Sequence, residues 1–227
     1  MMIKFVLLCS LTLWSSEGVF GVDSIKGTFF ADKAENGGCQ MPIASYRITD
    51  AIALGQETNL GPLIWRQGLC GQVFDIDCGH GMVSAVVVDT CNLNTKNCGI
   101  DMIKKTWDKA TGNQPPDVVK CKVTLSKANP LNDKEMVCYH RPDSDIGNEY
   151  FVMVGVLNTN GRIPKSADID GRPITRQNND AWFVFSSGGK PLFHDSAVVK
   201  FTFEDGGSVK FKLSDCKNGG DSVQVFQ

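Results

Sequence analysis

Residues 70–91 read CGQVFDIDCGHGMVSAVVVDTC. Phe74 to Asp77 and Val83 to Val88 are short segments rich in β-branched and aromatic residues, which favour strands. Cys78-Gly79-His80-Gly81 lies between them and has the glycines that a turn requires. This stretch therefore predicts two strands joined by a turn.

The same pattern recurs along the chain. Further predicted strands are Val118 to Leu125, Tyr150 to Leu157, Ala181 to Phe185, Val198 to Phe203 and Val209 to Leu213. Only Asp101 to Ala110 has helical spacing of its apolar residues, so we expect at most one short helix there. The chain is predicted to be all-β with minor α content.

Composition narrows the class of protein. The chain has 227 residues, a formal net charge of -2, 42% hydrophobic residues and 21% charged residues, which is typical of a globular protein rather than a disordered one. The pI near 5.9 argues against a nucleic-acid surface or a polybasic membrane patch, because both need clustered Lys and Arg. We expect no nucleic-acid or membrane partner, and a neutral polymer as ligand.

The N-terminus has the layout of a secretory signal peptide. Met1 to Gly21 contains Lys4, an apolar run from Phe5 to Trp14, and then small residues. Cleavage is expected after Gly18 or Gly21, which predicts a secreted, extracellular protein. Cys9 leaves with the signal peptide, and the eight remaining cysteines form an even set, which predicts disulfides in an oxidising compartment. We expect no metal and no other cofactor.

A polar stretch divides the rest of the chain. From Ser126 to Asn148 the apolar pattern gives way to Asn, Asp, Pro and Lys, which is typical of a linker or a long surface loop. We therefore predict a signal peptide over 1–21, a Cys-rich domain over 22–125, a linker over 126–147 and a second all-β domain over 148–227.

Three motifs carry a resemblance to a known family. They are the Cys70-to-Cys78 strand, the segment Val86-Val87-Val88-Asp89-Thr90-Cys91, and Gly99-Ile100-Asp101-Met102. In this order they resemble an expansin. The segment from Tyr150 to Asn158 resembles the first strand of the carbohydrate-binding domain of that family. The resemblance implies a six-stranded double-psi β-barrel followed by an immunoglobulin-like β-sandwich.

The resemblance also implies site residues. It places the general acid at Asp101, its polar companion at Asp89 and the expansin threonine at Thr28. Related glycoside hydrolases of family 45 carry a base on the first strand, where this chain has Ala31; Asp32 would point to the opposite face. From the residues alone, Asp101 could instead cap the predicted helix.

Carbohydrate contacts are expected in the second domain. Sugar C–H groups pack on aromatic faces, so Tyr150, Phe151 and Trp182 are the candidate substrate-binding residues, although neighbours on a strand face opposite ways. The family's third aromatic position falls at Asp180. In the predicted strand from Tyr150 to Leu157, the alternation of side chains places Val152, Val154 and Val156 on one face.

The resemblance further suggests a disulfide pattern. The resemblance implies Cys39 with Cys70 and leaves Cys78 with Cys121, the spacing of Cys91 and Cys98 allows a short-loop bridge, and Cys138 would then pair with Cys216. From the residues alone, eight cysteines allow 105 connectivities. In this chain Val73 stands at the family position that usually pairs with Cys121, so Cys78 would replace it.

These observations predict a monomeric expansin-like protein that binds cellulose or a related β-glucan and loosens it without hydrolysis. Two alternatives stay open: a family-45-like endoglucanase and a barwin-like defence or inhibitor protein. Weak hydrolysis of a glucan would be a sign of the first.

Overall fold

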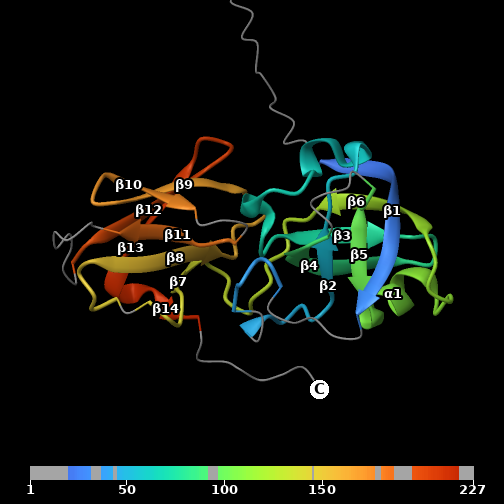
Figure 1. The fold of residues 1–227 in the computed structure, drawn as a ribbon, viewed down its shortest axis with the longest axis horizontal. Coiled ribbons are helices and arrows are strands. Elements are labelled where there is room, and N and C mark those ends of the chain that lie inside the picture. The colour runs from blue at the N-terminus through green and yellow to red at the C-terminus, as the bar shows by residue number, and fades with distance from the viewer. Residues whose placement is uncertain are drawn as a thin grey trace, which may run out of the picture.

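In the computed structural model, two β-rich domains lie side by side (Figure 1). The residues that the structure describes are 20–31, 37–42, 45–91, 97–144, 146–176, 180–186 and 196–219. Residues 1–19 of the predicted signal peptide and the predicted position of Asp32 lie outside them. Within the described residues, no helix is long and apolar enough to cross a membrane.

The first domain is a closed barrel of six strands. These are β1 (Gly21–Ala31), β2 (Ala51–Leu54), β3 (Val73–Asp77), β4 (Met82–Thr90), β5 (Ile100–Ile103) and β6 (Val119–Leu125). Their order around the barrel is β1-β5-β2-β4-β3-β6, with β1–β5 and β2–β4 parallel and the other described pairs antiparallel. The short helices are η2 (Thr58–Leu63), η3 (Gln67–Leu69) and α1 (Lys104–Thr111). Closure removes the exposed strand edges that would otherwise invite association.

The second domain is one eight-stranded sheet that folds over its own core. Its strands are β7 (Val137–His140), β8 (Phe151–Leu157), β9 (Pro164–Ile169), β10 (Arg172–Arg176), β11 (Phe183–Ser186), β12 (Val198–Phe203), β13 (Ser208–Lys212) and β14 (Lys217–Asn218). The sheet order is β13-β12-β9-β10-β11-β8-β7-β14, and η4 (Leu213–Asp215) follows β13. Val152, Val154 and Val156 share one core with Phe201 of β12, as the alternation predicts.

The two domains share a continuous apolar core. Tyr139, Leu157 and Trp182 of the second domain belong to the same buried cluster as the barrel interior. Gln72 and Thr159 exchange side-chain hydrogen bonds of 3.0 and 3.2 Å across this junction. At its rim, Arg66 forms a bidentate ion pair with Glu204, at 2.7 and 2.8 Å. The domains are thus joined by buried surface as well as by the chain.

All four disulfides have the expected partners. The bonds are Cys39–Cys70, Cys78–Cys121, Cys91–Cys98 and Cys138–Cys216. The first three lie in the barrel domain. The fourth connects β7 to the segment after η4 and so closes the second domain around its core.

Two sequence-based expectations need correction. The range 126–147 is not all linker, because β7 lies within it and pairs with β8. Asp101 is not a helix cap: it lies in β5, and the residue at the N-cap of α1 is Ile103. β5 has four residues, too few for periodicity to distinguish this strand from the start of the helix α1 that follows it.

Candidate functional site

Strand register aligns the predicted barrel residues in a row. Thr28 of β1 pairs with Asp101 of β5, Asp101 pairs with Ala53 of β2, and Ala53 pairs with Asp89 of β4. The neighbours of Asp101 along β5, Ile100 and Met102, are fully buried in the barrel core. Because alternate residues of a strand face opposite ways, Asp101 points away from that core. Four adjacent strands thus bring the candidate residues onto one face.

Thr28 and Asp101 form a directly bonded pair. The Thr28 hydroxyl donates to Asp101 Oδ1 at 2.6 Å, and both residues are half-buried. Burial raises the pKa of Asp101 above its ordinary value, and the hydrogen bond from Thr28 offsets part of that rise by stabilising the charged form. The arrangement favours a carboxyl group that can hold a proton and present it to a ligand.

Asp89 is tied to a neighbouring loop. Its Oδ1 accepts hydrogen bonds from the backbone N–H of Gly38 at 2.6 Å and of Thr90 at 2.7 Å. Gly37 packs so closely that a Cβ there would lie 2.3 Å from Asp89 Cγ. The carboxylate therefore holds the 37–38 segment against the barrel, and any contact between Asp89 and a ligand stays a prediction.

Two residues near the pair were missed from sequence. Glu57 is 5% exposed, and its Oε2 accepts the backbone N–H of Lys26 at 2.9 Å. It lies in an aperiodic loop, where nothing in the pattern marks a buried carboxylate. Phe30 is 38% exposed and lies two residues beyond Thr28 on β1. It lies at the register shift between Phe29 and Ala31, where the alternation between faces is interrupted, so the sequence pattern alone could not show that its ring is exposed.

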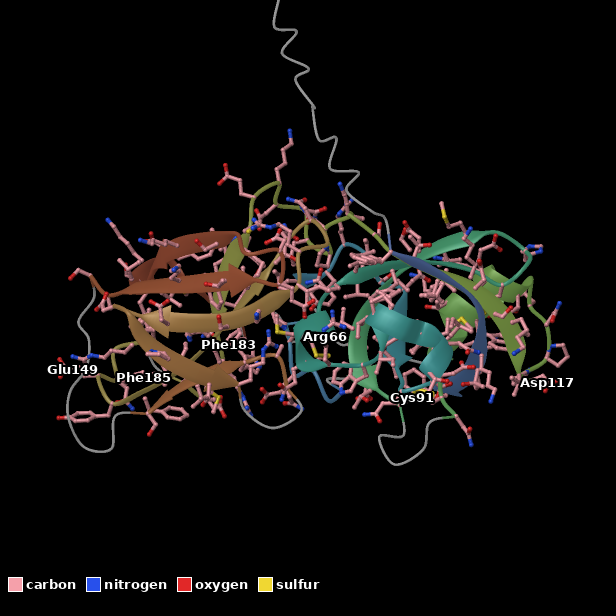
Figure 2. All side chains as sticks on the ribbon, turned by 90° about the horizontal axis from the view of Figure 1, so that it is seen from above. Arg66, Cys91, Asp117, Glu149, Phe183 and Phe185 are labelled. Atoms are coloured by element: carbon pink, nitrogen blue, oxygen red, sulfur yellow. A yellow bond between two sulfur atoms is a disulfide. The ribbon has the colours of Figure 1, made fainter. Side chains whose placement is uncertain are left out.

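The candidate aromatic residues of the second domain do not form one surface. Tyr150 is 47% exposed. Phe151, by contrast, is half-buried against the shared core. Glu149, which precedes Tyr150, lies at the end of the second domain that is remote from the barrel, whereas Arg66 lies at the junction (Figure 2). Tyr150 is therefore well separated from the barrel and offers its ring to solvent.

The expectation that Trp182 offers its ring to a sugar is wrong for this structure, because the residue is 0% exposed. Its indole N–H donates to the carbonyl of Gln40 at 2.9 Å. The ring packs on Gly155, where an added Cβ would lie 3.3 Å from it. Trp182 lies beneath the barrel segment that follows Cys39 and belongs to the shared core.

Asp180 is a buried carboxylate that holds neighbouring groups of the second domain in place. It is 5% exposed, and its Oδ1 accepts the backbone N–H of Trp182 at 3.0 Å. Burial raises the pKa of Asp180, while that hydrogen bond and the charge of Arg141 lower it. Its other oxygen lies 3.5 Å from Arg141 Nη1. Asp180 thus orients the start of β11 and presents no aromatic face.

Comparisons with known proteins identify the fold. No protein-family model matches the chain, and no curated protein does. Among solved structures, the apo expansin of Clavibacter michiganensis matches at a TM-score of 0.66 and 18% identity, over 88% of this chain and 94% of that one. A mutant of the same expansin in complex with cellohexaose matches at 0.64, with the same identity and coverage. At this identity the likeness shows the fold, and it confirms the predicted expansin-like architecture.

Proposed function

We propose that this chain, which has the expansin fold, is a secreted monomer that binds cellulose or a related cell-wall β-glucan and loosens its packing without cutting it. The fold is shared with a protein whose complex with cellohexaose has been solved. Four disulfides suit an extracellular location.

The Thr28–Asp101 pair is the observation that carries this proposal. Glycoside hydrolysis generally requires one protonated carboxyl and one ionised carboxylate that activates water or attacks carbon. Asp101 suits the first role because burial raises its pKa. Asp89, the carboxylate on the same row, has an oxygen already engaged by two backbone N–H groups and has Gly37 packed against it. The row therefore supports an acid without an available base.

Such a site can grip a glucan without completing its hydrolysis. A protonated Asp101 can donate a hydrogen bond to a glycosidic or hydroxyl oxygen, while Thr28 holds the carboxyl in place. Phe30 offers an exposed ring on the same strand as Thr28, and Tyr150 offers a second contact on the other domain. Binding energy gained at these points would compete with the contacts between neighbouring glucan chains.

One observation favours an endoglucanase as the second candidate. Asp101 and Asp89 are separated by β2 alone, so their backbones lie about 10 Å apart across two strand spacings. Inverting glycosidases place their carboxyls roughly 6.5–9.5 Å apart. The barwin-like alternative rests on the barrel alone and leaves the second domain without a role.

Two assays on the full chain separate these functions. We expect the protein to increase the extension of cellulose sheets under constant load, with no steady release of reducing ends from soluble or insoluble glucans. Asp89→Asn keeps an oxygen for the Gly38 and Thr90 N–H groups, so it should preserve loosening. Release of reducing ends above about 1 per second, abolished by Asp89→Asn, would establish the endoglucanase instead.

A further inference from the structure

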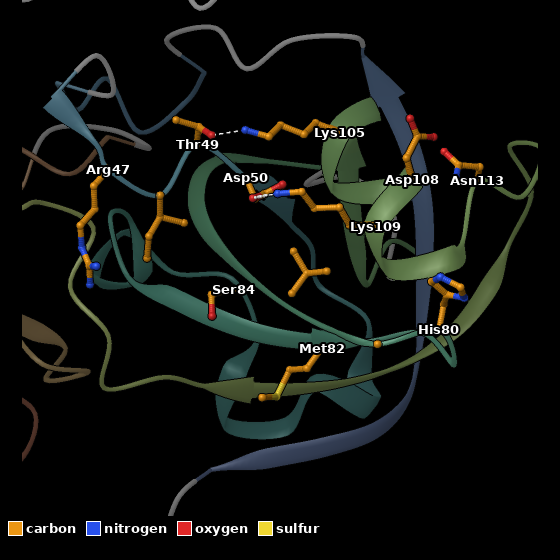
Figure 3. Close-up of a pocket in the computed structure, with 13 residues that line it drawn as sticks. Arg47, Thr49, Asp50, His80, Met82, Ser84, Lys105, Asp108, Lys109 and Asn113 are labelled. Carbon is orange, nitrogen blue, oxygen red and sulfur yellow. Dashed lines mark hydrogen bonds and ion pairs between the residues drawn. The ribbon is translucent and has the colours of Figure 1, made fainter.

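A second candidate site lies at the other end of the barrel strands. A cavity of about 780 Å³ opens between α1 and the starts of β2 and β4 (Figure 3). Its wall includes Arg47, Asp50, His80, Ser84, Lys105 and Lys109. Ser84 lies five residues before Asp89 on β4, a separation of about 17 Å along an extended strand. The cavity is therefore distinct from the row of Thr28, Asp101 and Asp89.

Asp50 has an unsatisfied oxygen in this wall. The residue is 8% exposed, and its Oδ2 pairs with Lys109 Nζ at 2.6 Å. Its Oδ1 is buried and has no hydrogen-bond partner among the residues that the structure describes. A buried acceptor without a partner loses its hydration without compensation. A ligand in the cavity can compensate this loss only if it brings a hydroxyl or another donor and the wall opens enough for that donor to reach Asp50 Oδ1.

Among the residues that the structure describes, two cations on the same wall have no acidic partner. Asp108 is paired with Lys104 at 2.6 Å, and Asp50 is paired with Lys109. Within the described part of the chain, Lys105 donates to the Thr49 hydroxyl and Arg47 Nε donates to the carbonyl of Asn129, and neither forms an ion pair. Their charges are therefore available to an anionic group.

The two requirements together identify a class of ligand. A neutral sugar supplies hydroxyl donors for Asp50 but leaves the cations without a partner. An inorganic anion satisfies the cations but is repelled by the Asp50 carboxylate, and one without a proton, such as sulfate, brings no donor. A sugar acid has both groups on one ring, and Met82, which is 74% exposed at the rim, provides apolar surface for sugar C–H groups. We propose that this cavity binds a uronic-acid unit of an acidic polysaccharide.

The test compares an acidic ligand with its neutral methyl ester and with a neutral glucan. Trigalacturonate, its methyl ester and neutral cellotriose are titrated into the full chain by calorimetry, and the contact residues are mapped by backbone NMR. We expect the free acid to bind, with changes in the backbone NMR shifts of Asp50, Ser84 and Lys105. The methyl ester should bind at least about tenfold more weakly. Raised salt should weaken binding of the acid.

Variants of the protein provide a second readout. Lys105→Gln and Arg47→Gln should each weaken trigalacturonate binding about tenfold, whereas Lys165→Gln, at an exposed position on β9, should not. Equal affinity for acid and ester, no binding of the acid, or tighter binding of inorganic phosphate would overturn the proposal. Pelleting with cellulose is measured separately, so failure here leaves the loosening function untouched.

Discussion

At the residue scale, Asp101 combines a function with a cost in stability. Its pKa is raised in the folded chain by burial, so folding favours the protonated form. Below the ordinary pKa of 3.8 the carboxyl is neutral in both states and there is no penalty. As the pH rises through the unfolded and then the folded pKa, ionisation increasingly destabilises the native state.

Asp101→Asn should therefore be more stable than the parent at pH 7, because an amide stays neutral and still accepts from Thr28. We expect a melting temperature higher by about 1–3 °C at pH 7 and no difference near pH 3. Calorimetry at the two pH values measures this, and a variant that melts lower at pH 7 would contradict it.

The same substitution should abolish loosening of a cellulose network, since an amide cannot supply the acid proton. The measurement is extension of cellulose under constant load. Asp215→Asn, at an exposed position in η4 of the second domain, is the matched control and should retain full activity. Unchanged extension with Asp101→Asn would show that the carboxyl has no part in the function.

Trp182 and Tyr150 should respond oppositely to truncation. Trp182→Ala removes a fully buried ring and should cost roughly 3–5 kcal/mol of unfolding free energy. Tyr150→Ala should change stability by at most about 0.5 kcal/mol but reduce retention on insoluble glucan. Denaturant unfolding and pelleting measure the two effects; full retention by Tyr150→Ala would remove Tyr150 from the binding surface.

At the element scale, the loop before Cys39 depends on Asp89. Gly37→Ala would place a Cβ 2.3 Å from Asp89 Cγ, so the loop or the carboxylate must move, at a cost of about 1–3 kcal/mol. Hydrogen exchange at the Gly38 amide should accelerate in this variant, because its bond to Asp89 is lost. Unaltered protection of Gly38 would mean that the loop is held by its other contacts.

Sequence predicted strands rich in Val and Phe better than the others. Val198–Phe203 was predicted to the residue, and β4 was found with its ends shortened, because their composition marks them, whereas β1, the longest strand, was not among the strands predicted from the pattern. β2 has four residues, all buried, so it shows no alternation between faces. β5 is equally short and continues into α1, which is why Asp101 was associated with the helix. The Thr28–Asp101 contact could be predicted only through the family resemblance.

At the scale of the whole molecule, the burial of Trp182 could not be predicted from its own strand. The ring is covered by the segment after Cys39, whose Gln40 carbonyl accepts the indole N–H of Trp182. These two residues are 142 positions apart in the sequence. For the same reason Tyr139 and Leu157 of the second domain are buried in the cluster that includes the barrel interior. Pattern along the chain reports which residues are apolar, and not which domain will cover them.

We therefore expect the full chain to unfold in one cooperative transition. Separating the domains would expose the shared apolar core, and its burial contributes favourable free energy to both. A fragment of residues 126–227, which keeps the Cys138–Cys216 bond, should be markedly less stable than the intact protein. Two resolved calorimetric transitions, or a fragment as stable as the whole, would contradict this.

The burial of the three tryptophans that the structure describes has an optical consequence. Trp65, Trp107 and Trp182 are 8%, 1% and 0% exposed, so in the folded protein their emission comes from an apolar environment. Unfolding should shift it to longer wavelength and report on the barrel and the junction together. A glucan that contacts Phe30 or Tyr150 would leave these indoles untouched, so a silent fluorescence titration would not indicate that the ligand is unbound.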